Sequence, residues 1–204
     1  MMAVILKSKN VLIKNCYFNT GDDCIAIKSG RNADGRRINI SSENIVIQGC
    51  TMKDGHGGVV IGSEMSGNVR NVFVENCIMD SPNLERALRI KTNSQRGGKV
   101  ENIYMQNCTI GEVSDAVIKV NFHYGEGDAN NYVPIVKNIY IKNITSKKSK
   151  YALYLDGYAR SPITNIELED CDFIGVGRPN KINHCLGLKF KNVFINNEHY
   201  SYSP

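Results

Sequence analysis

The sequence predicts an all-β fold, a right-handed parallel β-helix of about six coils that occupies residues 1–204 as a single domain. Three observations lead to this prediction. A nine-residue phrase that starts with Asn recurs along the chain at intervals of 27 to 36 residues. Apolar and polar residues alternate within the phrase, which is typical of a strand with one buried face. A shorter apolar strand follows in each repeat, so each repeat is one coil that buries its apolar side by stacking.

The repeated phrase is the first strand of each coil. Its leading Asn is expected to bond through its amide to the coils above and below, which lie ~4.8 Å away. The copies are NVLIKNCYF from Asn10, NIVIQGCTM from Asn44, NVFVENCIM from Asn71, NIYMQNCTI from Asn102, NIYIKNITS from Asn138, NIELEDCDF from Asn165 and a shortened NVFINN from Asn192.

The second strand of each coil completes the solenoid. No segment between the strands has a helical period, and the LxxLxLxxN signature of the competing solenoid, the leucine-rich repeat, is missing. The second strands are CIAIKSG from Cys24, GVVIGSE from Gly58, ALRIKTN from Ala87, AVIKVN from Ala116 and ALYLDGY from Ala152.

The cysteines share one phase of the repeat. The chain has no CxxC and no Cys/His spacing of the kind that binds zinc, and free cysteine is among the residues most often buried. We therefore expect a ladder of reduced thiols inside the helix, with neither disulfides nor a metal site. The seventh place of the phrase is cysteine in five copies: Cys16, Cys50, Cys77, Cys108 and Cys171.

Composition excludes several classes of protein. Hydrophobic residues make up 42% of the chain and charged residues 22%, which is enough apolar material for a core. No apolar run approaches the ~18 residues of a membrane-spanning helix, and MMAVILKSKN lacks the features of a signal peptide. The net charge of +5 fits an acidic partner. It is too small to indicate nucleic acid, and no nucleic-acid motif accompanies it.

The repeat brings charged residues of different coils to one exterior patch. Asp22 and His56 each follow the leading Asn of their coil by 12 residues, so they should be neighbours on adjacent coils. Asp23 lies beside Asp22. Several glycines surround these residues and are expected to leave room for a ligand near the backbone: Gly21, Gly55, Gly57 and Gly58.

Two cations join the patch from the next coil. Arg89 and Lys91 flank Ile90, which continues an inward series with Ile27 and Ile61, so both cations point outward. Acidic turns and outward cations are common on solvated surfaces. Two carboxylates, an imidazole and two cations on one face instead predict a site for acid/base chemistry.

At these residues the chain resembles glycoside hydrolase family 28, the polygalacturonases of pectin breakdown. Four motifs carry the family's site: Asn-Thr-Asp, Asp-Asp after Gly or Gln, Gly-His-Gly, and Arg-Ile-Lys. Three of them occur in this chain in family order, as Gly21-Asp22-Asp23, Gly55-His56-Gly57 and Arg89-Ile90-Lys91. The resemblance covers essentially the whole chain.

The resemblance implies inverting hydrolysis of α-1,4-galacturonosyl bonds in pectin or polygalacturonate. One carboxyl protonates the glycosidic oxygen in that mechanism, and a second carboxylate activates water on the far face of the sugar. By motif, Asp22 would be the general acid and Asp23 a base shared with the Asp of the fourth motif. His56 would keep Asp22 protonated or orient the leaving group.

The resemblance also implies how substrate is held. Arg89 and Lys91 would bind the galacturonate carboxylate, the first by a bidentate contact and the second as a point charge. Tyr124 would contact the sugar, although Tyr158 lies near the same face. No metal or cofactor is implied, the partner is a pectic polysaccharide or oligogalacturonide, and a monomer is expected. Members of the family are usually secreted or periplasmic.

The Asn-Thr-Asp motif is the departure from the family pattern. Asn19-Thr20-Gly21 is similar to it, but this segment is joined to the Asp-Asp turn and has no acid at its third place. Family members are usually longer, with coils upstream. We interpret the chain as the C-terminal part of such a catalytic domain, and we expect its hydrolysis to be impaired without the upstream Asp.

Four other functions stay open on the sequence. A non-catalytic pectin- or oligogalacturonide-binding remnant would keep the cations without a full pair of bases, and a structural fragment of a longer or split enzyme would behave similarly. A calcium-dependent pectate lyase shares the fold but needs an acidic calcium cluster and an Arg or Lys base. A phage-type adhesin would share only the solenoid.

Overall fold

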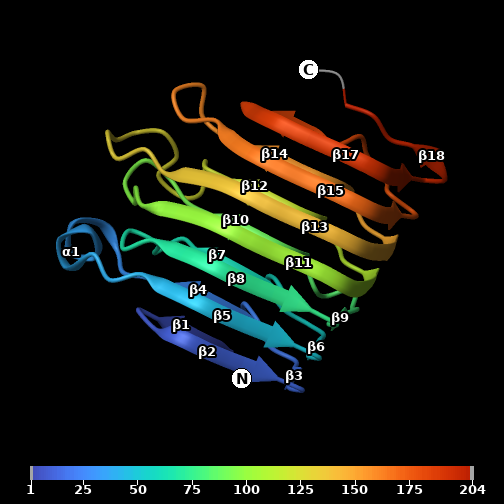
Figure 1. Cartoon of the computed structure of the whole chain (residues 1–204), viewed down its shortest axis with the longest axis horizontal. Coiled ribbons are helices and arrows are strands. Elements are labelled where there is room, and N and C mark those ends of the chain that lie inside the picture. Colours follow the sequence, from blue (N-terminus) through green and yellow to red (C-terminus); the bar gives the residue numbers. More distant parts are fainter. Residues whose placement is uncertain (1, 203–204) are drawn as a thin grey trace.

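Two stacks of parallel strands run side by side along the molecule and form a right-handed parallel β-helix (Figure 1). The computed structural model describes residues 2–202. The first stack, in order, contains β1 (Ala3–Leu6), β4 (Ile25–Lys28), β7 (Val59–Gly62), β10 (Arg86–Lys91), β12 (Ala116–Asn121), β14 (Tyr151–Asp156) and β16 (Lys181–Asn183). The second contains β2 (Lys9–Lys14), β5 (Ser42–Gln48), β8 (Val69–Glu75), β11 (Lys99–Glu112), β13 (Ile135–Lys148), β15 (Ile163–Phe173) and β17 (Cys185–Ile195).

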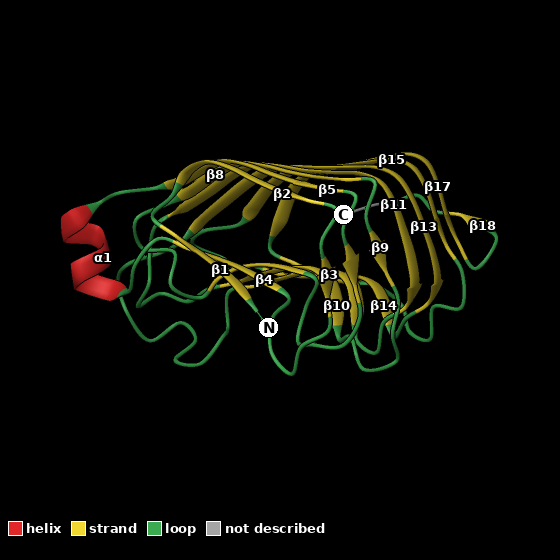
Figure 2. Ribbon diagram, turned by 90° about the horizontal axis from the view of Figure 1, so that it is seen from below, coloured by secondary structure: helices red, strands yellow, loops and turns green. Residues whose placement is uncertain are grey.

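Shorter strands complete the coils. The first coils contain three additional two-residue strands, β3 (Tyr17–Phe18), β6 (Thr51–Met52) and β9 (Ile78–Met79). β6 pairs with β3 on one side and β9 on the other, and β9 pairs with the end of β11. From β11 onward the strand of the second stack and the short strand that follows it merge into one long strand. This long strand bends around the coil, as seen end-on in Figure 2. The last strand, β18 (Glu198–His199), pairs antiparallel with β17. No helix in residues 2–202 has the length and apolar character to cross a membrane.

The Asn residues that lead the phrases form a hydrogen-bonded ladder, as the repeat predicts. Six of them have the left-handed backbone, with φ between 56° and 60°, which Asn tolerates better than most residues. The side-chain amide of each of these except Asn10 donates to the side-chain oxygen of the Asn one coil earlier, at 2.9–3.2 Å. The amide therefore fixes the register of successive coils.

We expect Asn102→Ala to lower the free energy of unfolding by about 1–3 kcal/mol. The change removes the bonds to Asn71 and Asn138, and it places alanine at a φ of 60°, which alanine tolerates less well than Asn does. Asn102→Gly is the matched control, since glycine accepts this φ and loses only the hydrogen bonds. Urea denaturation followed by circular dichroism measures both variants, and equal stability of Asn102→Ala and wild type would contradict the role of the ladder.

The last phrase has a different register from the one that its letters indicate. β17 pairs with β15 so that Gly187, and not Asn192, lies opposite Asn165. Gly187 has φ of 67°, and a Cβ there would lie 2.8 Å from the Asn165 side-chain oxygen. Asn192 instead occupies the sixth place of the phrase, where its amide donates to Asp170 at 2.8 Å. Glycine can replace Asn because both accept the left-handed backbone.

The core lies between the stacks and contains most of the predicted cysteine ladder. Cys50, Cys77, Cys108 and Cys171 are at most 2% exposed, and all seven cysteines of the chain are free. The prediction was wrong for Cys16, which is exposed. Cys16 lies in the first coil, where a neighbouring coil covers it from one side only.

One short helix interrupts the strands, although the sequence shows no helical period there. It is α1 (Asn32–Ile38), in the long interval between β4 and β5. Tertiary contacts hold it. The Arg36 guanidinium donates to the carbonyls of Gln95 and Arg96 at 2.8 and 3.0 Å, and it lies 3.5 Å from the centre of the Tyr132 ring.

Candidate active site

Three titratable side chains lie one above another just before the N-terminal ends of the strands β4, β7 and β10. Each lies three residues before a strand residue, and these strand residues are paired with one another across β4, β7 and β10. Asp22 precedes Ile25, His56 precedes Val59 and Glu85 precedes Leu88 in this way. The backbone agrees, since the N–H of His56 donates to the carbonyl of Asp22 at 3.2 Å. The expected neighbourhood of Asp22 and His56 is therefore present, and Glu85 extends it by one coil.

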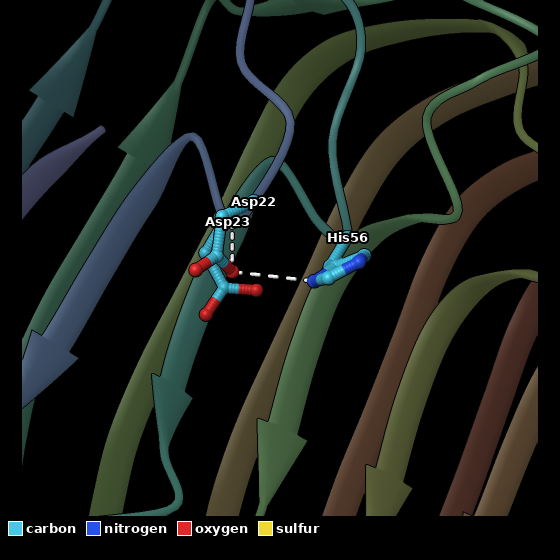
Figure 3. Close-up of side chains that lie close together, drawn as sticks. All are labelled: Asp22, Asp23 and His56. Carbon is cyan, nitrogen blue, oxygen red and sulfur yellow. Dashed lines mark hydrogen bonds and ion pairs between the residues drawn. The ribbon is translucent and has the colours of Figure 1, made fainter. Parts of the chain in front are cut away.

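Asp22 is the more exposed carboxylate of the adjacent pair (Figure 3). Its Oδ1 accepts the backbone N–H of Asp23 at 2.7 Å and lies 3.2 Å from Nδ1 of His56. The Asp23 N–H and, to a smaller extent, His56 lower the pKa of Asp22. In the free protein His56 thus favours the charged form of Asp22, which is opposite to the expectation that it keeps Asp22 protonated.

Asp23 lies in a different environment from its neighbour. Asp23 is 2% exposed, and its Oδ2 accepts a hydrogen bond from the Lys91 ammonium at 2.9 Å. A guanidinium nitrogen of Arg89 lies 3.8 Å from Oδ1, and this oxygen has no hydrogen-bond partner among the described residues. Since a buried carboxylate is costly without a counter-charge, the cations of Lys91 and Arg89 stabilise Asp23 in its buried position.

Arg89 and Lys91 reach this site from β10. Ile90 between them pairs with Ile61, which pairs with Ile27, and all three are fully buried, so the cations point outward as predicted. Their side chains are nevertheless largely covered, at 13% and 9% exposure. Burial lowers the pKa of Arg89.

Tyr124, and not Tyr158, is the tyrosine of this site. Its ring lies 5.6 Å from the Arg89 guanidinium and 5.5 Å from the Lys91 ammonium, within cation–π range. Tyr158 is 2% exposed and belongs to the core, where its hydroxyl donates to the carbonyl of Phe122.

All six predicted site residues line one cleft, together with residues that the sequence reasoning missed. Lys28 follows an inward Ile as Lys91 does, so the same alternation would have found it. Glu85 was missed because it follows its leading Asn by 14 residues and not 12; counting backward from the paired strand finds it. The additional lining residues are Met2, Lys28 and Glu85.

The glycines of the motifs serve packing more than ligand access. A Cβ at Gly55, where φ is 142°, would lie 2.2 Å from the carbonyl oxygen of Asp22. Gly57 and Gly58 would meet core side chains at 2.6 and 2.7 Å. Gly21 alone among the four has open space around it, so the expected room for a ligand is confirmed only there.

Asp22, Asp23 and His56 also offer three donor atoms that lie within 4.8 Å of one another. The donor set does not fit a hard cation such as Ca²⁺, which prefers several free oxygen ligands. The Lys91 ammonium already bonds to Asp23, and the second cation, Arg89, lies beside it.

The fold and this cleft define the class, a parallel β-helix with carboxylates and cations lining one cleft on the outer side of a stack. The chain belongs to the glycosyl hydrolases family 28, whose family model matches residues 4–198. The charged cleft therefore lies where three motifs of that family fall.

Similar proteins extend this assignment. The chain is 39% identical to a hyperthermoactive exopolygalacturonase from Thermotoga maritima, with a TM-score of 0.92 over 98% of this chain and 44% of that one. It is 32% identical to the "Probable polygalacturonase" of Vitis vinifera over 77% of this chain. A family 28 exopolygalacturonase of Yersinia enterocolitica shares the fold at 18% identity, with a TM-score of 0.76 over 93% of this chain and 35% of that one. The chain spans about a third of the length of the Vitis protein.

Proposed function

We propose that the chain acts on pectin as a glycoside hydrolase, cleaving α-1,4-galacturonosyl bonds by inverting acid/base hydrolysis. The observation that carries this proposal is the pair of adjacent carboxylates in unlike environments. Asp22 is open to the cleft, whereas Asp23 is buried against Lys91 and Arg89. Carboxylates kept in different environments suit the separate tasks of acid and base.

Substrate would supply what the free site lacks. A galacturonate carboxylate drawn to Arg89 brings negative charge and excludes water near Asp22, and both effects raise a carboxyl pKa. Asp22 could then hold the proton that goes to the glycosidic oxygen. Asp23, whose Oδ2 accepts the Lys91 ammonium at 2.9 Å, would accept a proton from the attacking water. His56, 3.2 Å from Asp22, would orient it.

A second candidate is a non-catalytic oligogalacturonide-binding protein. The lowered pKa of Asp22 and the ion pair of Asp23 with Lys91 favour it, because Asp22 then favours its charged form and Asp23 already has a partner in the free protein. The cleft would retain Arg89, Lys91 and Tyr124 for the sugar acid.

A reducing-end assay on polygalacturonate, with and without EDTA, separates these functions. The hydrolase produces new reducing ends that EDTA does not suppress, and its products are saturated. Loss of activity in EDTA with unsaturated products would instead identify a calcium-dependent lyase. Binding of oligogalacturonide without any new reducing ends would identify the non-catalytic protein.

Recognition of the sugar carboxylate is expected to depend on Lys91. Charge-assisted contacts contribute about 1.5–3 kcal/mol, so Lys91→Ala should weaken oligogalacturonide binding about tenfold or more in isothermal titration. Removing Lys91 also leaves Asp23 buried without its partner, so the thermal stability of the variant is measured alongside. Wild type binding fully methyl-esterified oligomers as tightly as free acids would contradict carboxylate recognition without any mutation.

A further inference from the structure

The outward face of the first stack carries further polar residues beyond the cleft. The strand register places Arg89 beside Lys119, Lys119 beside Tyr154, and Tyr154 beside Lys181. These four residues therefore form one column that runs along the helix axis, with one residue on each successive strand and neighbouring strands ~4.8 Å apart. The cleft follows the same axis, since its lining extends from Met2 before β1 to Tyr124 after β12.

Two ammonium groups, one from each neighbouring strand, lie close to the Tyr154 ring. The Lys119 ammonium lies 4.1 Å from the centre of its ring and the Lys181 ammonium lies 4.7 Å from it. Lys181 also donates to the Tyr154 hydroxyl at 3.0 Å. Because the two lysines come from the strands on either side of β14, the ring separates two positive charges along the column.

The two lysines are anchored by carboxylates of the same surface. Lys119 bonds to Asp115 at 2.8 Å, and Asp115 also accepts Arg86 at 2.7 Å. Lys181 bonds to Asp156 at 2.7 Å. Burial lowers the pKa of Lys119, and the neighbouring charges of Arg86 and Arg89 act in the same direction. Anchored, partly buried ammonium groups are preorganised to bind an anion, because little side-chain freedom is left to lose.

We propose that Lys119 and Lys181, spaced by Tyr154, form an accessory subsite for the carboxylates of further uronate sugars in a bound oligosaccharide. The subsite continues the row that begins at Arg89. A polyuronide carries one carboxylate on every sugar, so a chain lying along the axis would meet cations in succession. The inference rests on the proposed function, since it assumes that an acidic oligosaccharide occupies the cleft.

The test compares binding of a short and a long oligogalacturonide by isothermal titration. Lys181→Gln removes the charge but keeps a donor for Asp156, and Tyr154→Phe keeps the ring but removes the bond to Lys181. Lys191→Gln is the matched control, because Lys191 is also ion-paired, to Glu169 at 2.7 Å, but lies on β17 of the second stack. Circular dichroism and thermal melting establish that each variant is folded.

Wild type should bind the long oligomer more tightly than digalacturonate. Lys181→Gln should weaken binding of the long oligomer about tenfold and leave digalacturonate unchanged, whereas Lys191→Gln should change neither. Wild-type length dependence in a folded Lys181→Gln variant would overturn the subsite while leaving the proposed function intact. No binding of any oligogalacturonide by wild type would overturn both.

Discussion

Hydrolysis of polygalacturonate by these 204 residues alone is expected to be feeble, and to rise about 10²–10⁴-fold when one coil ending in Asn-Thr-Asp is joined ahead of β1. Among residues 2–202, the cleft contains Asp22 and Asp23 as the family-matched carboxylates, and Asp23 is paired with Lys91. Inverting hydrolysis needs a base free to take a proton from water. A third carboxylate would share the charge of Lys91 and Arg89 and release Asp23 for this task.

The register indicates where that carboxylate would lie. Ala3 in β1 pairs with Ile25 in β4, and Met2 already lines the cleft, so we expect an acid at the end of the added coil to lie one strand from Asp23. The added coil would also supply a wall of the cleft and more substrate positioning. The matched control carries Asn-Thr-Asn in the same coil, which adds the wall without the charge. A reducing-end assay compares the three proteins.

Equal turnover with and without the coil would show that Asp23 suffices as base. Equal turnover with Asn-Thr-Asp and Asn-Thr-Asn, both above that of the 204 residues, would show that the gain comes from the wall and not from the carboxylate. Each outcome contradicts the expected role of the third acid in releasing Asp23.

The fold was predictable because the same strand pattern recurs in every coil of the sequence. The Asn ladder, the buried series of Ile27, Ile61 and Ile90, and four of the five predicted cysteines follow from phase alone. The exceptions have local causes. Cys16 is exposed for lack of a second neighbouring coil, and Gly187 replaces Asn through the backbone conformation that both accept. Helix α1 depends on contacts of Arg36 with distant residues, which no local pattern reveals.

The grouping of the site residues was predictable for the same reason, but their pairing was not. Phase arithmetic gathers Asp22, His56 and Arg89 into one cleft. It gives no reason for Lys91 to bond to Asp23, 68 residues earlier, because that bond depends on side-chain reach across two strands. It also missed Glu85, whose Oε1 lies 4.0 Å from Nε2 of His56, because a longer turn shifts the count.

Asp22→Asn is expected to lower hydrolysis by about 10²–10⁴-fold, measured on the protein extended by the Asn-Thr-Asp coil. The amide oxygen can still accept the Asp23 N–H, so the turn is retained, but the amide has no proton of suitable acidity for the glycosidic oxygen. Oligogalacturonide affinity should therefore stay near that of wild type. The matched control is Asp34→Asn, an exposed Asp of α1 that is ion-paired with Arg37 and should leave hydrolysis unchanged.

The pH dependence gives Asp22 a second test that does not need mutation. Its pKa in the free protein is lowered from 3.8, so the protonated fraction is small near neutral pH and increases as the pH falls. Since kcat/KM reports the free enzyme, its value should rise between about pH 7 and about pH 5. The same rise should be absent from the residual activity of Asp22→Asn. A variant that keeps the wild-type pH profile at a reduced rate would assign the acid to another group, and Glu85 in the same cleft would be the next residue to replace.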